Sequence, residues 1–291
     1  MGSAEGTLTP AARWDITTPA RAGRLPGVSL AGFRDRTTSP LDLPVIPYPA
    51  VTLAIDLGNG LIVDSARDRQ QGGSVVFGLS PGAVRARGQN IDALQIRLSP
   101  VIAHTVLGAS LEPGEEIISL DALWGRGGTQ LLEQLRAAAS WDERFAIAEA
   151  ALARRYETGR AVDPEVSYAW RQMVLGQGRI RIEPLAAEVG WSRKRLWARF
   201  RSQIGLSPKR AAQLIRFDHA AHRLAAGHSP GSVAAESGYA DQSHLHRDVL
   251  TFTGVTPTAV SAAPWLAVDD VAWTAREPVE GTKKTSRNVS P

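Results

Sequence analysis

The sequence of 291 residues contains no cysteine. Without cysteine the chain has no disulfide bond, no thiolate zinc site and no thiol nucleophile. Long apolar runs are also missing, since the most apolar stretch, residues 43–57, contains three prolines and Asp56. The first ten residues lack the basic and apolar regions of a signal peptide. These absences predict a cytoplasmic protein that does not enter a membrane.

Histidine is scarce in the first half of the chain, where residues 1–178 contain only His104. A metal-dependent enzyme of the cupin type needs several histidines and a carboxylate, so metal catalysis is not expected there. His104 falls on a helix predicted over residues 100–107, and we interpret it as a structural or surface histidine. The sequence therefore predicts that the protein is not an enzyme and that it holds neither a cofactor nor a metal.

The positive charge is concentrated in one segment. The whole chain has a formal net charge of +4, but residues 179–263 alone hold 12 basic and 6 acidic residues, a net charge of +6. The part before this segment has a net charge of −2, and the part after it is neutral. A basic excess on one compact helical segment is expected of a protein that neutralises phosphates. A solvated basic face is the alternative interpretation.

The chain changes from strand-like to helix-like patterns after about residue 98. Short apolar runs separated by glycine and proline fill residues 28–98, a pattern typical of β-strands. Ser140 and Glu143 then form a capping box, and two successive apolar stripes favour a helical hairpin packed on a core over a dimer interface. The predicted fold class is α+β, with an N-terminal β-rich domain that includes the hairpin and an all-α C-terminal domain. The predicted boundaries are residues 10–160 for the first domain, 161–178 for a helical connector, 179–263 for the helical domain, and 264–291 for a tail with almost no apolar periodicity that is disordered from about residue 277.

Two stretches of the basic segment resemble each other. They are EVGWSRKRLWARFRSQIGLSP at residues 188–208 and ESGYADQSHLHRDVLTFTGVTP at residues 236–257. Each has a short apolar helix, a glycine suited to a positive φ, an aromatic residue and a capped second helix. That order is typical of a helix-turn-helix motif, whose second helix enters the major groove of DNA. The duplication favours DNA binding over two amphipathic helices with solvated polar faces.

Helical periodicity assigns an inner and an outer face to each second helix. The inner faces carry Leu196, Phe200 and Ile204 in the first copy and Leu245, Val249 and Phe252 in the second. Ser192 and Asp241 stand at the predicted N-caps. Between the copies, residues 208–226 predict one linker helix of roughly 28 Å, comparable with the roughly 34 Å between successive major-groove faces. One chain can therefore read two adjacent groove segments.

Residues 179–260 resemble the DNA-binding domains of the AraC/XylS family of transcriptional regulators. The likeness rests on the first recognition helix followed by GLSP, on RFDHAAHRLAAG and on GYADQSHLHRDVLTFTGVTP. It implies a tandem pair of helix-turn-helix subdomains that binds promoter DNA as an activator or repressor. Carried over by position, it implies base-reading residues at Lys194, Trp197 and Ala198 in the first copy and at Gln242, Ser243, His244 and Arg247 in the second. Five further basic residues are assigned to phosphate contacts, which fix the position of a protein on DNA but do not read the base sequence: Arg193, Arg195, Arg199, Arg201 and Lys209.

Two positions depart from the family pattern. The family commonly has arginine where Ala198 stands, which predicts weaker base reading by the first recognition helix. A large aromatic residue is usual where Val249 packs, which predicts a less firmly packed second subdomain. Two pairs of histidines are spaced like zinc ligands but fall in the linker helix and in a DNA-facing helix, so no zinc site is predicted there: His219 with His222, and His244 with His246.

The first half fits the order seen in many members of this family, in which a small cupin-like β-barrel senses a ligand or mediates dimerisation. The resemblance therefore implies a small-molecule effector or a second copy of the chain as partner, and it leaves a contact with RNA polymerase open. No motif identifies the ligand-binding residues. Phe33, Tyr48 and Phe77 are candidates for the lining of an effector pocket, although core packing is the favoured role of each.

Two other classes of protein can also carry a DNA-binding module, besides effector-controlled transcription regulators. DNA alkylation-repair proteins can carry such a helix-turn-helix module, but they transfer the alkyl group to a cysteine, and this chain has none. A nonspecific or architectural DNA-binding protein without an effector response remains as the alternative. It would bind unrelated duplexes with similar affinity, whereas a regulator prefers its site by a factor of about a thousand or more.

Overall fold

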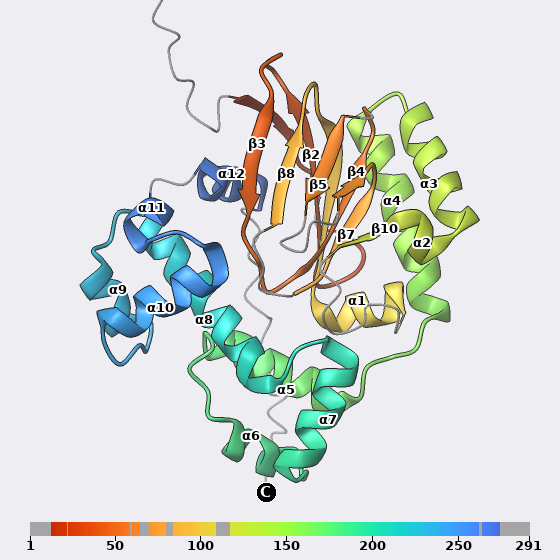
Figure 1. The fold of residues 1–291 in the computed structure, drawn as a ribbon. Coiled ribbons are helices and arrows are strands. Elements are labelled where there is room, and N and C mark those ends of the chain that lie inside the picture. The colour runs from red at the N-terminus through yellow and green to blue at the C-terminus, as the bar shows by residue number, and fades with distance from the viewer. Residues whose placement is uncertain are drawn as a thin grey trace, which may run out of the picture.

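The computed structural model describes residues 13–21, 23–58, 60–64, 70–79, 84–108, 117–261 and 264–273. Within these ranges two β-sheets form the N-terminal part, helices cover one side of them, and a group of smaller helices makes up the C-terminal part (Figure 1). The predicted α+β class, with a β-rich first region and an all-helical second region, is confirmed. No described helix is long and apolar enough to cross a membrane.

The two sheets are antiparallel. The larger has the order β1-β2-β9-β4-β7-β10 and the smaller the order β3-β8-β5-β6. The strands of the larger sheet are β1 (Trp14–Thr17), β2 (Val28–Asp35), β9 (Asp92–Leu98), β4 (Val51–Asp56), β7 (Val75–Phe77) and β10 (Ile117–Ser119). Those of the smaller are β3 (Leu41–Val45), β8 (Val84–Gly88), β5 (Leu61–Asp64) and β6 (Gln70–Gly72).

Side-chain alternation divides the larger sheet into two faces. On β4, Leu53 and Ile55 belong to a core shared with the helices, whereas Ala54 belongs to a second cluster that includes Leu61 and Val84 of the smaller sheet. A strand places successive side chains on opposite faces, so β4, β7 and β9 each contribute to both clusters. One face of the larger sheet therefore packs on helices, and the other faces the smaller sheet.

Four of the described helices cover the larger sheet: α1 (Pro100–Leu107), α2 (Leu120–Trp124), α3 (Arg126–Ala137) and α4 (Trp141–Thr158). Of these, α3 and α4 pack against each other and form the predicted hairpin. Ser140 caps α4 by accepting a hydrogen bond from the Glu143 amide at 3.2 Å. Phe145 and Leu152 of α4 lie in the same core as Leu53 of the sheet. The apolar stripe of α4 therefore packs on the core, as the sequence predicted.

The C-terminal helices form the two predicted helix-turn-helix copies. The first copy is α6 (Ile182–Glu188) with α7 (Arg193–Ile204), and the second is α9 (Pro230–Glu236) with α10 (Gln242–Thr253). Gly190 and Gly238 make the turns at φ values of 69° and 75°, which a glycine adopts without strain. The linker helix α8 (Pro208–Ala225) contacts both recognition helices, and α11 (Pro257–Ser261) packs on α8.

Helix α5 (Pro164–Leu175) joins the core of the C-terminal region rather than only connecting to it. It contacts α7 and α8, and the rings of Trp170 and Phe200 lie 6.5 Å apart. Val166, Ala169 and Met173 of α5 are fully buried in the same cluster. The first copy also touches the N-terminal region, where α1 contacts α7.

The last described helix, α12 (Pro264–Ala272), returns to the β-sheets and lies beside them in Figure 1. It contacts β1 and α8, and Ala272 packs with Ala31 and Phe33 of β2. The sequence showed almost no apolar periodicity in this tail, because one short helix buries few residues and one of these is the aspartate Asp269. The predicted disorder from about residue 277 falls outside the described residues.

Candidate DNA interface and effector pocket

The first recognition helix, α7, starts at Ser192, whose hydroxyl accepts a hydrogen bond from the Arg195 amide at 3.2 Å. Leu196 and Phe200 are completely buried, so the opposite face of the helix is open to solvent. This face carries the predicted contact residues Arg193, Lys194, Arg195, Trp197, Ala198 and Arg201. Trp197 is 46% exposed, which is unusual for so large an apolar side chain, and the Arg201 guanidinium lies 5.1 Å from its ring.

Arg199 differs from the other basic residues of α7 because it already has a carboxylate partner. Its guanidinium makes two hydrogen bonds to Asp163, of 2.7 and 2.8 Å, at the start of α5. These bonds hold the pKa of Asp163 below its ordinary value. Gln203 adds a bond of 3.0 Å by accepting from the Asp163 amide. The bidentate pair fastens α7 to α5, a role that the sequence analysis did not foresee.

The second recognition helix, α10, starts at Asp241, which accepts a hydrogen bond from the His244 amide at 2.7 Å. Its outer face exposes Gln242, Ser243 and Arg247, while His244 is half-buried with its ring edge-on to Tyr239 at 5.2 Å. Val249 is completely buried, and Phe252 stacks on Phe217 of α8 at 4.7 Å. Phe252 and Phe217 therefore supply aromatic packing to the second subdomain, in which Val249 stands at the position usually taken by an aromatic residue.

A buried charge network holds α10 on the linker helix. Arg216 of α8 bonds to Asp248 of α10 at 2.9 Å, and its guanidinium lies 4.4 Å from the ring of Tyr239. Burial raises the pKa of Tyr239 above its ordinary value, and the charge of Asp248 adds to this rise. The network orients the second recognition helix through two elements at once.

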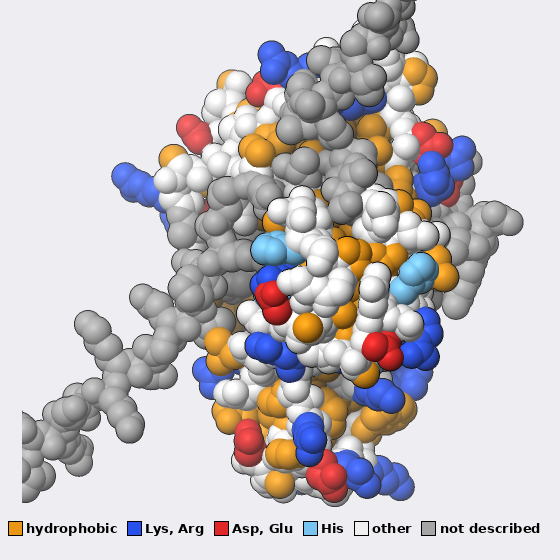
Figure 2. Space-filling model, turned by 90° about the vertical axis from the view of Figure 1, so that its left-hand side faces the viewer, with side chains coloured by type: hydrophobic (Ala, Val, Ile, Leu, Met, Phe, Trp, Pro, Cys, Tyr) orange, Lys and Arg blue, Asp and Glu red, His pale blue; other side chains and the backbone are white. Residues whose placement is uncertain are grey.

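The structure brings Lys209 and His244 to one surface hollow between the two copies. Lys209 is in the first turn of α8, and the hollow is also lined by Arg216 and Ile182. Figure 2 shows Lys and Arg side chains spread over the lower, helical part of this face of the molecule. Among the positively charged side chains that were predicted to contact DNA, all of them described, Arg199 pairs closely with Asp163, and Arg193 lies 3.9 Å from Glu183 at the surface.

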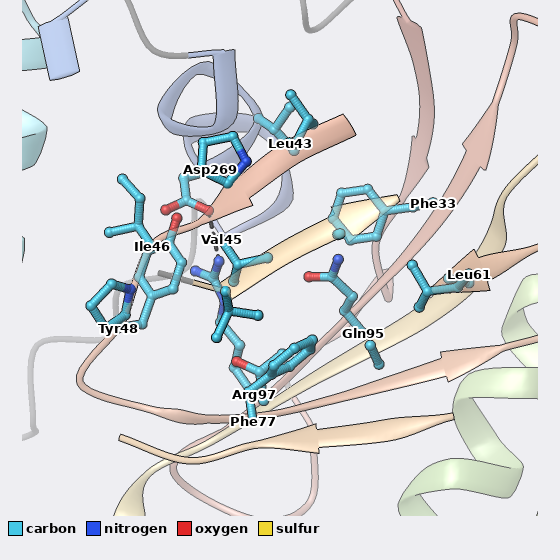
Figure 3. Close-up of a pocket in the computed structure, with 18 of the residues that line it drawn as sticks. Phe33, Leu43, Val45, Ile46, Tyr48, Leu61, Phe77, Gln95, Arg97 and Asp269 are labelled. Atoms are coloured by element: carbon cyan, nitrogen blue, oxygen red, sulfur yellow. Dashed lines mark hydrogen bonds and ion pairs between the residues drawn. The ribbon is translucent and has the colours of Figure 1, made fainter. Parts of the chain in front are cut away.

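A second candidate site is a cavity of about 170 Å³ between the two sheets. Its wall is mostly apolar and includes the three aromatic residues that the sequence offered as lining candidates, Phe33, Tyr48 and Phe77. Small residues of the larger sheet, such as Ala54 and Ala93, leave the space between them open. Figure 3 shows the lining side chains pointing into this space from strands of both sheets.

One arginine stands in this apolar wall. Arg97 of β9 donates a hydrogen bond to Asp269 of α12 at 2.8 Å. Its guanidinium lies 3.8 Å from the ring of Tyr48 and 4.2 Å from the ring of Trp273, so two aromatic rings flank it. Burial raises the pKa of Tyr48 well above its ordinary value, and the negative charge of Asp269 adds to the rise.

Asp269 connects the cavity to the DNA-binding region. Its second carboxylate oxygen lies 3.4 Å from His222 Nε2, on the linker helix α8. His222 Nδ1 in turn lies 2.8 Å from the carbonyl oxygen of Asp218. Burial acts to raise the pKa of Asp269, but Arg97, His222 and Tyr48 together outweigh it and leave this pKa below its ordinary value.

Sequence reasoning missed Arg97 and Asp269 as site residues. A signal for Arg97 was present in β9, where alternation places Ala93, Gln95 and Arg97 on one face. Nothing local marked Asp269, since its partner lies 172 residues earlier in the chain.

The histidines lie on three helices, α1, α8 and α10, and in the segment before α9. Within the described ranges no three metal-ligating side chains converge on a metal-sized site. His104 is on α1, where burial lowers its pKa and the nearby charge of Arg160 lowers it further. Its neighbours include Asp163 and Gln203, so it lies in the contact between the N-terminal region and the first helix-turn-helix copy.

The comparisons with known proteins agree with this arrangement. Residues 185–263 match the family model described as "Helix-turn-helix domain". Residues 185–263 therefore carry a helix-turn-helix domain, which assigns DNA binding to the C-terminal part of the chain. No curated protein matches the sequence significantly.

Solved structures align with much of this chain, at TM-scores below 0.5. The structure of ToxT from Vibrio cholerae O395 has 11% identity and a TM-score of 0.47, covering 82% of this chain and 98% of that one. Unsaturated fatty acid-bound ToxT from Vibrio cholerae strain SCE256 has 10% identity and a TM-score of 0.47, covering 82% and 96%. The AraC-like transcriptional activator CuxR has 13% identity and a TM-score of 0.27, covering 66% and 81%. At these values no ligand or mechanism of those proteins is transferred to this chain.

Proposed function

We propose that this protein is a sequence-specific transcription regulator of the AraC/XylS type whose affinity for DNA is controlled by a small molecule in the N-terminal pocket. The observation that carries the DNA-binding part is the pair of capped recognition helices, α7 and α10, both packed on the single linker helix α8. Each buries its apolar face and exposes a polar face rich in donors. Such a pair can enter two successive major grooves from one chain.

We infer that base reading falls to the N-terminal turns of the two helices, where base contacts concentrate. In the first copy these residues are Lys194, Trp197 and Ala198, and in the second they are Gln242, Ser243, His244 and Arg247. Arg193, Arg195, Arg201 and Lys209 bind phosphates. Arg199 contributes by positioning α7 through Asp163.

The effector part of the proposal is supported by the cavity between the sheets. It is mostly apolar and holds one charged pair, Arg97 with Asp269, as ligand pockets commonly combine an apolar wall with few polar groups. The same Asp269 lies against His222 of α8, which gives the pocket a physical connection to both recognition helices. Contacts with RNA polymerase and with a second copy of the chain belong to the same proposal.

The test is to sequence the genomic fragments that the pure full-length protein retains in about 150 mM salt, and then to titrate the preferred fragment against a scrambled duplex. A regulator binds the preferred site about a thousandfold more tightly or better. Equal affinities for the two duplexes would instead support the architectural alternative.

A further inference from the structure

The pocket has one fixed position for an anion. Among the described residues that line the cavity, Arg97 is the only cation and Asp269 the only anion. A guanidinium held in an apolar wall requires a negative partner, because desolvating an unpaired charge is strongly unfavourable. The side chain of Arg97 is only 15% exposed, and the flanking rings of Tyr48 and Trp273 keep it in place.

That anion position is filled by α12 rather than by a strand of either sheet. Asp269 comes from the last described helix, and Val268 and Trp273 of the same segment also line the cavity. Figure 3 shows the Asp269 carboxylate reaching the Arg97 guanidinium from the helix that borders the pocket. Removal of α12 would therefore open the pocket and leave Arg97 without its partner.

The position of α12 depends on a small number of tertiary contacts. The helix has nine residues, and isolated helices of this length are not stable in water. Leu266, Asp269 and Ala272 are buried. Since Asp269 makes the ion pair with Arg97, an anion that takes its place also removes one of the main contacts of α12.

The same carboxylate joins the pocket to the linker helix. Asp269 lies between Arg97 and His222, and His222 keeps a second contact with the Asp218 carbonyl oxygen on its own helix. Release of Asp269 therefore breaks this polar link between β9 and α8, while His222 keeps its contact with Asp218.

We propose that α12 carries an internal competitor for the effector: its Asp269 carboxylate occupies the site at Arg97 that the carboxylate of a small organic acid takes, and the acid releases α12 from the pocket and from α8. This inference rests on the proposed effector function and specifies its ligand as an apolar body with one negative charge. The size of the apolar body follows from the cavity of about 170 Å³. A cavity of about 150 Å³ holds one benzene ring, so the apolar body is about one ring in size.

The experiment uses the full chain and two probes that match in shape but differ in charge, phenylacetate and phenylacetamide. Isothermal titration calorimetry measures both against the wild-type protein and three variants. In Asp269→Asn the internal competitor loses its charge. In Arg97→Gln/Asp269→Asn both charges are removed together, so neither is left unpaired. Asp42→Asn is the matched control, because it makes the same change in an exposed ion pair with Arg85 outside the cavity.

We expect Asp269→Asn to bind phenylacetate about tenfold more tightly than wild type and to bind phenylacetamide with unchanged affinity. The double variant should bind the two probes alike, and Asp42→Asn should behave as wild type. Amide hydrogen exchange of residues 264–273 in the wild-type protein should speed up with saturating phenylacetate but not with phenylacetamide.

Three outcomes would overturn the inference. If Asp269→Asn changes the affinity for both probes equally, or for neither, then Asp269 does not compete for the anion site. That result would leave the proposed effector pocket unaffected. If phenylacetate binds without faster exchange in α12, the helix is not released. If neither probe binds any variant, the inference and the effector part of the proposed function both fail, whereas DNA recognition is judged separately by the duplex titration.

Discussion

The two helix-turn-helix copies share a motif but are held to the molecule in different ways. The first recognition helix is fastened to α5 by the half-exposed pair of Arg199 and Asp163. The second is fastened to α8 by the buried pair of Arg216 and Asp248 under the ring of Tyr239. A buried pair leaves an uncompensated charge when one partner is removed, whereas an exposed pair is largely screened by water. The two copies should therefore respond differently to the loss of their ion pairs.

The largest loss of stability should come from removing α5, the helix to which the first copy is fastened. We expect a fragment of residues 161–263 to fold and to bind duplex DNA, because it keeps the Trp170–Phe200 contact and the buried face of α5. A fragment of residues 179–263 lacks this face and should unfold at lower denaturant concentration or fail to fold. Urea denaturation followed by circular dichroism compares the two. Equal midpoints would place the boundary of the folding unit at residue 179, as the sequence alone suggested.

The next largest loss of stability should come from breaking the buried ion pair of the second copy. Arg216→Leu should lower the free energy of unfolding by about 3 kcal/mol, because Asp248 remains in the interior without its partner. Arg216→Leu/Asp248→Leu should recover much of this loss, since it leaves no unpaired charge. Denaturant titration of the three proteins measures both differences. A double variant as unstable as the single one would show that the pair itself, rather than the orphaned charge, determines stability.

A smaller effect separates base contacts from phosphate contacts. Arg247→Ala should cost about 1 to 3 kcal/mol on the preferred site and little on a scrambled duplex, because a guanidinium on the outer face of α10 can bridge O6 and N7 of a guanine. Arg201→Ala should weaken both duplexes alike and reduce the salt slope by about one unit. Titrations at two salt concentrations measure these changes. Equal losses on both duplexes for Arg247→Ala would assign that residue to a phosphate.

The smallest effect on DNA affinity should come from Arg199→Ala. Because its guanidinium is bonded to Asp163, the salt slope should stay as in wild type, in contrast to Arg201→Ala. The pair holds the pKa of Asp163 below the ordinary 3.8, so its contribution to stability is present above this pH and is lost as the pH falls through the lowered pKa. Acid unfolding of Arg199→Ala and wild type should therefore converge at low pH. A salt slope reduced by one unit would show that Arg199 also reaches a phosphate.

Helices whose signals are local could be predicted from the sequence. The range predicted for α1 matches the structure, and Ser140, Ser192 and Asp241 form the N-cap hydrogen bonds that their positions indicated. Of the strands, β2, β4, β5, β7 and β9 are apolar runs within residues 28–98, the range in which the sequence predicted β-strands. Short strands such as β8, with the sequence VRARG, alternate small or apolar residues with arginine and carry no apolar run that marks them.

The residues of the candidate sites also differ in whether a local sequence pattern marks them. The outer faces of α7 and α10 follow from helical periodicity, so their exposed residues could be named from the sequence. The commitment of Arg199 to Asp163 could not, because the two residues are 36 positions apart and nothing in either segment specifies how α5 meets α7. Phe33, Tyr48 and Phe77 were named as lining candidates, yet only the facing of the two sheets brings them around one cavity.

By itself the sequence determined the duplicated helix-turn-helix motif, its caps and turns, the basic charge of that segment and the absence of cysteine chemistry. These properties depend on residues within a few turns of one another, where backbone geometry relates spacing directly to face and partner. Only the tertiary structure decided the pocket, the choice of the face of β9 that lines it, and the pairing of Arg97 with Asp269 across 172 residues of chain. A contact of that separation depends on how sheets and helices pack as whole elements, and no local pattern encodes it.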